Sequence, residues 1–118
     1  MSYDINFWKY KEGVYLDNHE VYIAACCNGK TIDGLEELPV DAILDKIAEA
    51  FSDWTRLGLK DYEKEGGGSF QIYTTGQIVR FDCYNMTGDD MNRLIDVMLE
   101  FGCPLYDPQI STRFDGMG

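Results

Sequence analysis

This sequence has a single histidine and lacks the familiar catalytic motifs. The 118-residue chain contains one histidine, His19, and its four cysteines include no C-x-x-C pair. A serine or cysteine nucleophile generally needs a neighbouring base, and here only His19 could supply an imidazole. No D-x-D-x-D-G loop and no H-E-x-x-H pair occurs either. The sequence therefore predicts a protein that is not an enzyme and that holds no metal and no cofactor.

Long apolar runs are also missing. No segment approaches the roughly 18 to 20 apolar residues of a membrane-spanning helix, and no basic segment followed by an apolar one opens the chain. The cysteines, at positions 26, 27, 83 and 103, are expected to be buried or inert thiols. Together these features favour a location in the reducing cytoplasm.

Basic residues are scarce relative to acidic ones. Ten Lys and Arg residues face 21 Asp and Glu residues, which gives a formal net charge of -11 at pH 7. Such a charge opposes binding to a nucleic-acid backbone or an anionic membrane. A charged partner of this chain is therefore expected to be basic.

The length and composition are those of one folded domain. A chain of 118 residues, 45% hydrophobic and 26% charged, is typical of a soluble domain with a single core. We therefore expect one domain over residues 1–118.

The opening stretch YDINFWKY has an unusual alternation. Tyr3, Ile5 and Phe7 would occupy one face of a strand, but the opposite face carries Trp8 and Tyr10. A strand with one buried face normally carries polar residues on the other, so these two aromatic rings need an explanation.

Helices are expected in three places. Pro39 followed by an apolar stripe predicts the main helix, between Leu38 and Gly58. Thr87 fits the cap of a second helix that ends at Gly102. Residues 19–27, with Asn18 as a possible cap, suit a short helix or a strand, and we favour the helix.

A hairpin is predicted around Gly76 and Gln77. Its two-residue loop would pair Phe70 with Cys83, Ile72 with Phe81 and Thr74 with Val79 on a core face, and Ser69 with Tyr84, Gln71 with Asp82 and Tyr73 with Arg80 on the other. The glycine run 66–68 leads into a strand rather than a helix, which makes it a poor phosphate-binding loop. Residues 104–114 contain two prolines and predict an edge strand or an irregular arm.

This order of elements predicts an α+β fold, a ferredoxin-like two-layer sandwich with two main helices on one face of an antiparallel sheet. The uncovered face would then be shared by five side chains, and it either binds a partner or forms a second small core under the C-terminal arm or residues 14–17. The five side chains are Trp8, Tyr10, Tyr73, Arg80 and Tyr84.

Acidic side chains recur at every fourth position of the predicted main helix. Asp41, Asp45, Glu49 and Asp53 would line one exposed face at intervals of about 6 Å. This row is either a solvated helix face or an anionic ridge that attracts a basic partner.

Three stretches of the chain resemble a known group of proteins. The segments YDINFWKY, GLEELP at 34–39 and FGCPLYDPQISTRFD at 101–115 are similar to small bacterial immunity proteins that accompany polymorphic or contact-dependent toxins. The resemblance touches both ends and the middle of the chain. It implies a cytoplasmic partner, a cognate toxin that is often a basic nuclease and that tight binding keeps inactive.

Two functions follow as hypotheses. In the first, the chain is an immunity protein that uses the acidic row to attract a basic toxin and the aromatic side chains as anchors. In the second, it is a small-molecule sensor or minor enzyme, with Trp8, Tyr10 and Tyr73 stacking on a ligand and Arg80 pairing with its anionic group.

Overall fold

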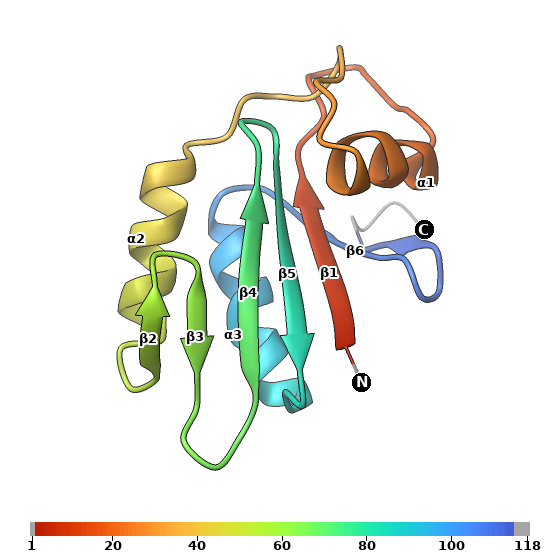
Figure 1. Ribbon diagram of the computed structural model, residues 1–118. Coiled ribbons are helices and arrows are strands. Elements are labelled where there is room, and N and C mark those ends of the chain that lie inside the picture. Colours follow the sequence, from red (N-terminus) through yellow and green to blue (C-terminus); the bar gives the residue numbers. More distant parts are fainter. Residues whose placement is uncertain (1, 115–118) are drawn as a thin grey trace.

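A computed structural model describes residues 2–114, and the structural statements below concern that part of the chain. It is an α+β structure with one antiparallel sheet, and helices pack against this sheet (Figure 1). The strands are β1 (Ser2–Trp8), β2 (Thr55–Gly58), β3 (Asp61–Glu63), β4 (Ser69–Thr74), β5 (Ile78–Tyr84), β6 (Leu105–Asp107) and β7 (Thr112–Arg113). The helices are α1 (Asn18–Val21), which continues into the π-helix η1 (Tyr22–Cys27), then α2 (Val40–Ala50) and α3 (Gly88–Glu100).

The seven strands lie in the order β2-β3-β4-β5-β1-β6-β7. Every neighbouring pair in this order is antiparallel. The N-terminal strand β1 is therefore central, with β5 on one side and β6 on the other.

The predicted hairpin is confirmed in register. β4 and β5 pair Phe70 with Cys83, Ile72 with Phe81 and Tyr73 with Arg80, as the loop at Gly76 and Gln77 requires. The expected edge strand near the C-terminus is confirmed as β7, which pairs with β6, whereas β6 lies inside the sheet between β1 and β7.

The helix α3 has the expected limits. The Thr87 hydroxyl accepts a hydrogen bond from the Asp90 N–H at 3.1 Å, which satisfies one of the first free amides of the helix. At the other end, Gly102 has a φ of 76°, the left-handed conformation that commonly ends helices.

The main helix is shorter than predicted. α2 ends at Ala50, and the prediction of a helix up to Gly58 is wrong, because residues 55–58 form the edge strand β2. The apolar spacing continues through Phe51 and Trp54, but the chain turns between them and the Trp54 N–H donates to the Phe51 carbonyl at 3.0 Å. This turn brings the Trp54 ring within 5.1 Å of the Phe51 ring, so the same apolar contacts form without a continued helix.

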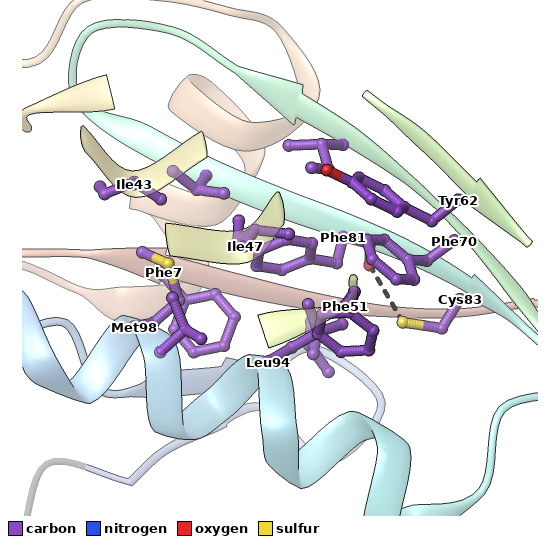
Figure 2. Close-up of a cluster of buried hydrophobic side chains, with 14 of the residues drawn as sticks. Phe7, Ile43, Ile47, Phe51, Tyr62, Phe70, Phe81, Cys83, Leu94 and Met98 are labelled. Carbon is purple, nitrogen blue, oxygen red and sulfur yellow. Dashed lines mark hydrogen bonds between the residues drawn. The ribbon is translucent and has the colours of Figure 1, made fainter. Parts of the chain in front are cut away.

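The main core lies between α2, α3 and one face of the sheet (Figure 2). The strands supply a continuous set of aromatic and branched side chains, and the two helices supply the covering layer. The buried members include Ile5, Phe7, Phe70, Ile72, Val79, Phe81 and Cys83 from β1, β4 and β5, Ile43 and Ile47 from α2, and Leu94, Val97 and Met98 from α3.

A second core covers the opposite face of the sheet and explains the aromatic residues of the opening strand. The side chain of Trp8 is fully buried there and lies 5.2 Å from the Tyr106 ring, centroid to centroid. The prediction of helices on one face alone is therefore wrong, because α1 and η1 pack on the second face against Trp8 and Tyr106. The alternative that a second small core forms on this face is confirmed, and the C-terminal arm contributes Tyr106 to it, but residues 14–17 are not among its members and α1 and η1 supply Val21, Ala25 and Cys26.

The short helix over the second core begins one residue earlier than expected and widens into a π-helix. Asp17, and not Asn18, is its cap, since its carboxylate accepts from the Glu20 N–H at 3.0 Å. Val21, Ala25 and Cys26 are all buried. The wider turn is shown by the Asn28 N–H, which donates to the Ile23 carbonyl five residues earlier at 3.1 Å.

The glycine run before β4 has a packing role at its last member. A Cβ atom on Gly68 would lie 2.8 Å from the backbone oxygens of Tyr84 and Asn85, whereas one on Gly67 would meet the flexible Lys64 side chain. We expect Gly68→Ala to lower the free energy of unfolding by about 1–3 kcal/mol, as overpacking does. Gly67→Ala should change it by much less. Urea unfolding of both variants tests this, and equal midpoints would contradict it.

Candidate interaction surfaces

The five side chains predicted to share an open sheet face differ in burial and in the residues that they contact. Trp8 is buried beneath η1, and Tyr10 beside it is partly buried, with its ring 6.3 Å from the Trp8 ring. The Tyr10 hydroxyl donates a hydrogen bond to Asn18 Oδ1 at 2.6 Å. These two residues therefore attach the first strand to the covering helix.

Tyr73 and Arg80 are brought together, as the predicted register required. The Arg80 guanidinium lies 4.6 Å from the centre of the Tyr73 ring. It also donates to the Cys26 carbonyl at 2.6 Å and forms an ion pair with Asp82, 3.2 Å away. Tyr84 lies at the far end of β5 and is 38% exposed. The side chains that the small-molecule hypothesis assigned to a ligand thus contact one another and the protein itself.

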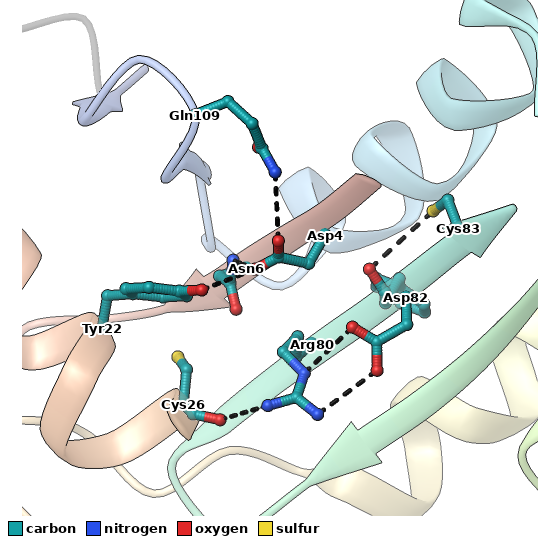
Figure 3. A network of polar contacts seen from close by, with 9 residues as sticks. Asp4, Asn6, Tyr22, Cys26, Arg80, Asp82, Cys83 and Gln109 are labelled. Carbon is teal, nitrogen blue, oxygen red and sulfur yellow. Dashed lines mark hydrogen bonds and ion pairs between the residues drawn. The ribbon is translucent and has the colours of Figure 1, made fainter. Parts of the chain in front are cut away.

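A polar network on the same sheet face was not expected from the sequence (Figure 3). The Asp4 carboxylate accepts hydrogen bonds from the Tyr22 hydroxyl at 2.9 Å and from Asn6 Nδ2 at 3.1 Å. The amide of Gln109, in the turn between β6 and β7, donates to Asp4 at 3.1 Å. Burial, with the hydrogen bonds to Cys27 and Asp4, raises the pKa of Tyr22. The network therefore holds η1 and the C-terminal hairpin to β1 through one carboxylate.

The acidic row lies on the other side of the sheet, on the outer surface of α2. Asp41, Asp45 and Glu49 are exposed on this helix. Asp53 is exposed as well, but it follows the helix, so the prediction that it continues the same helical row is wrong. Arg93 Nη2 lies 3.0 Å from its carboxylate, and this hydrogen bond lowers the pKa of Asp53.

The neighbouring helix α3 enlarges this acidic surface. α2 and α3 pack side by side, and exposed Asp96 and Glu100 lie on α3 next to a shallow groove of about 500 Å³ between the two helices. We call the resulting surface the acidic helical face, and define it as Asp41, Asp45, Glu49, Asp53, Asp96 and Glu100.

Two basic side chains lie within the acidic helical face. Lys46 Nζ is 4.0 Å from both Glu49 and Glu100, and Arg93 contacts Asp53. Six acids and two bases leave this surface with a formal charge of about -4, and exposed ion pairs at such distances are weak. The surface is therefore strongly anionic, and its charges stand close enough together to act on one partner.

The described residues contain no group of three or more His, Cys, Asp and Glu side chains that could hold a metal ion. Three of the cysteines are buried, and burial raises the pKa of Cys26 and of Cys83 to about 12 and that of Cys103 to about 11. These three thiols are poor nucleophiles at neutral pH. Within residues 2–114, none of the helices combines the length and the apolar character that crossing a bilayer requires.

Comparison with protein-family models, with curated proteins and with solved structures found no match to this chain. The functional argument therefore depends on the surfaces described above.

Proposed function

We propose that this protein is an immunity protein that binds a basic bacterial toxin domain and neutralises it. The observation that carries the proposal is the acidic helical face, an exposed surface on rigid helices in a chain of net charge -11. The resemblance of both ends and the middle of the sequence to immunity proteins supports the same function.

The acidic helical face suits inhibition of a basic partner in two respects. All of its acids except Asp53 lie on α2 and α3, whose apolar sides pack into the main core, so the helices that present them are fixed to the sheet. A nuclease must expose cations that bind phosphate groups, and a surface that presents carboxylates competes for those cations. Neutralisation would then result from covering the substrate-binding surface of the toxin.

We further propose that the fold contains a ferredoxin-like unit, made of β1, α2, β4, β5, α3 and β6. The other elements are additions to this unit. Support comes from the strand order β4-β5-β1-β6 and from the packing of α2 and α3 on one face. The cytoplasm is the proposed location, because a toxin of this kind threatens the cell that contains its target.

Growth rescue tests the proposed function. The toxin domain encoded beside the gene of this chain should arrest growth when it is expressed alone, and coexpression of the chain should restore growth. An unrelated nuclease toxin serves as the control, and this chain should not protect against it. Growth arrest that persists although the chain accumulates in soluble form would contradict the proposal.

A further inference from the structure

A second groove lies at the end of the sheet where β1 leaves it. Its volume is about 490 Å³, and its walls come from the segment after β1, the end of α3 with the residues that follow it, and Arg113 and Phe114. This groove is separate from the one between α2 and α3 and shares none of its lining residues.

The walls of this groove are rich in exposed apolar side chains. Tyr15 is 75% exposed, Leu99 52% and Phe114 53%, and all three line the groove. Apolar side chains that gather around one depression usually mark a contact surface rather than chance exposure.

The charge of the groove is opposite to that of the protein. Among the described residues that line it, Lys9, Lys11 and Arg113 are basic and Glu12 is acidic, although the chain as a whole has more than twice as many acids as bases. Lys9 Nζ lies 3.5 Å from Glu36, and such an exposed ion pair exchanges readily with a carboxylate from another molecule.

One of these cations is held in place by the second core. The Arg113 guanidinium lies 4.8 Å from the centre of the Tyr10 ring and 5.5 Å from that of Trp8, and it donates to the Trp8 carbonyl at 2.9 Å. Because Trp8 is fully buried, the planar cation has a defined position beside the groove.

We infer that this groove binds an acidic peptide segment of a partner protein, with an apolar side chain of the segment among Tyr15, Leu99 and Phe114 and its carboxylates beside Lys9, Lys11 and Arg113. Charge complementarity favours an acidic occupant. A basic partner, which the acidic helical face would attract, is repelled by the cations of this groove. The inference concerns a second surface and does not depend on the identity of the toxin.

Fluorescence anisotropy with labelled synthetic peptides tests the groove. The probe is an eight-residue peptide of alternating Asp and Leu or Phe, and the comparison peptide replaces every Asp with Asn. We expect the acidic peptide to bind at least fivefold more tightly than the Asn analogue, despite the repulsion from a chain of net charge -11.

Two protein variants with the same change in net charge locate the binding. Lys9→Gln with Lys11→Gln should weaken binding of the acidic peptide at least fivefold, and Leu99→Ser should weaken it as well. The control variant, Lys30→Gln with Lys60→Gln, changes two exposed lysines outside the groove. Its affinity for the acidic peptide should stay within twofold of the wild-type value. Equal binding of the two peptides, an unchanged affinity in the Lys9 and Lys11 variant, or a concentration-dependent dimer that the Leu99 variant abolishes would each overturn the inference.

Discussion

Replacing Trp8 with alanine is expected to lower the free energy of unfolding by about 3–5 kcal/mol, the usual cost of removing a large buried aromatic side chain. Trp8 is fully buried between β1, η1 and Tyr106, so its removal leaves a cavity in the second core. The cation–π contact of Arg113 with its ring would also be lost. Urea unfolding followed by circular dichroism measures the change without relying on tryptophan fluorescence.

Tyr84→Ala is the matched control for this loss, since Tyr84 lies on the same sheet face but is partly exposed. Tyr84→Ala should lower the free energy of unfolding by about 1 kcal/mol or less, as expected for a residue at the surface. If Trp8→Ala instead kept the wild-type unfolding midpoint and weakened binding of a partner, Trp8 would be an interface anchor, and the second core would not depend on it.

Neutralising the acids of α2 is expected to slow association with a basic toxin by roughly tenfold or more at low salt, because long-range attraction accelerates encounter. The variant combines Asp41→Asn, Asp45→Asn and Glu49→Gln, and it leaves Asp53 in its contact with Arg93. Stopped-flow mixing at several salt concentrations provides the rates. The difference should disappear near 1 M salt, where the Debye length is about 3 Å.

A second triple variant, Asp33→Asn with Glu63→Gln and Glu65→Gln, removes three exposed charges from other parts of the surface. It has the same net charge as the α2 variant and should associate with the toxin nearly as fast as the wild type. If both variants slow association equally, only the overall charge matters, and the acidic helical face is not the binding surface.

The sequence correctly predicted those helices and strands whose ends are determined by a few neighbouring residues, such as a tight turn or a helix cap. The loop at Gly76 and Gln77 specifies the pairing of β4 with β5, because a two-residue hairpin allows one register. Thr87 and Gly102 likewise mark the ends of α3 through their own capping geometry. These predictions needed no knowledge of distant parts of the chain.

The missed features depend on contacts between distant segments. The end of α2 was missed because Phe51 and Trp54 continue the helical spacing, and only their ring contacts with Phe70 reveal the turn. The cover over the second sheet face required knowing that residues 18–27 pack against Trp8 and Tyr106. Of the site predictions, the acidic row on α2 could be read from its spacing, whereas the contribution of α3 to that surface is a tertiary feature.

The central place of β1 has a consequence for synthesis of the protein. Of the strands described, β1 is synthesised before all the others, whereas its neighbours β5 and β6 come late in the order, and Trp8 pairs with Ile78 only after residues 9–78 have been added. During that interval, a strand with Ile5, Phe7 and Trp8 is without its sheet partners, a state in which nascent chains are prone to aggregate. The sheet can therefore close around β1 only after both β5 and β6 have been synthesised, so the central strand is the one that spends the longest time without its partners.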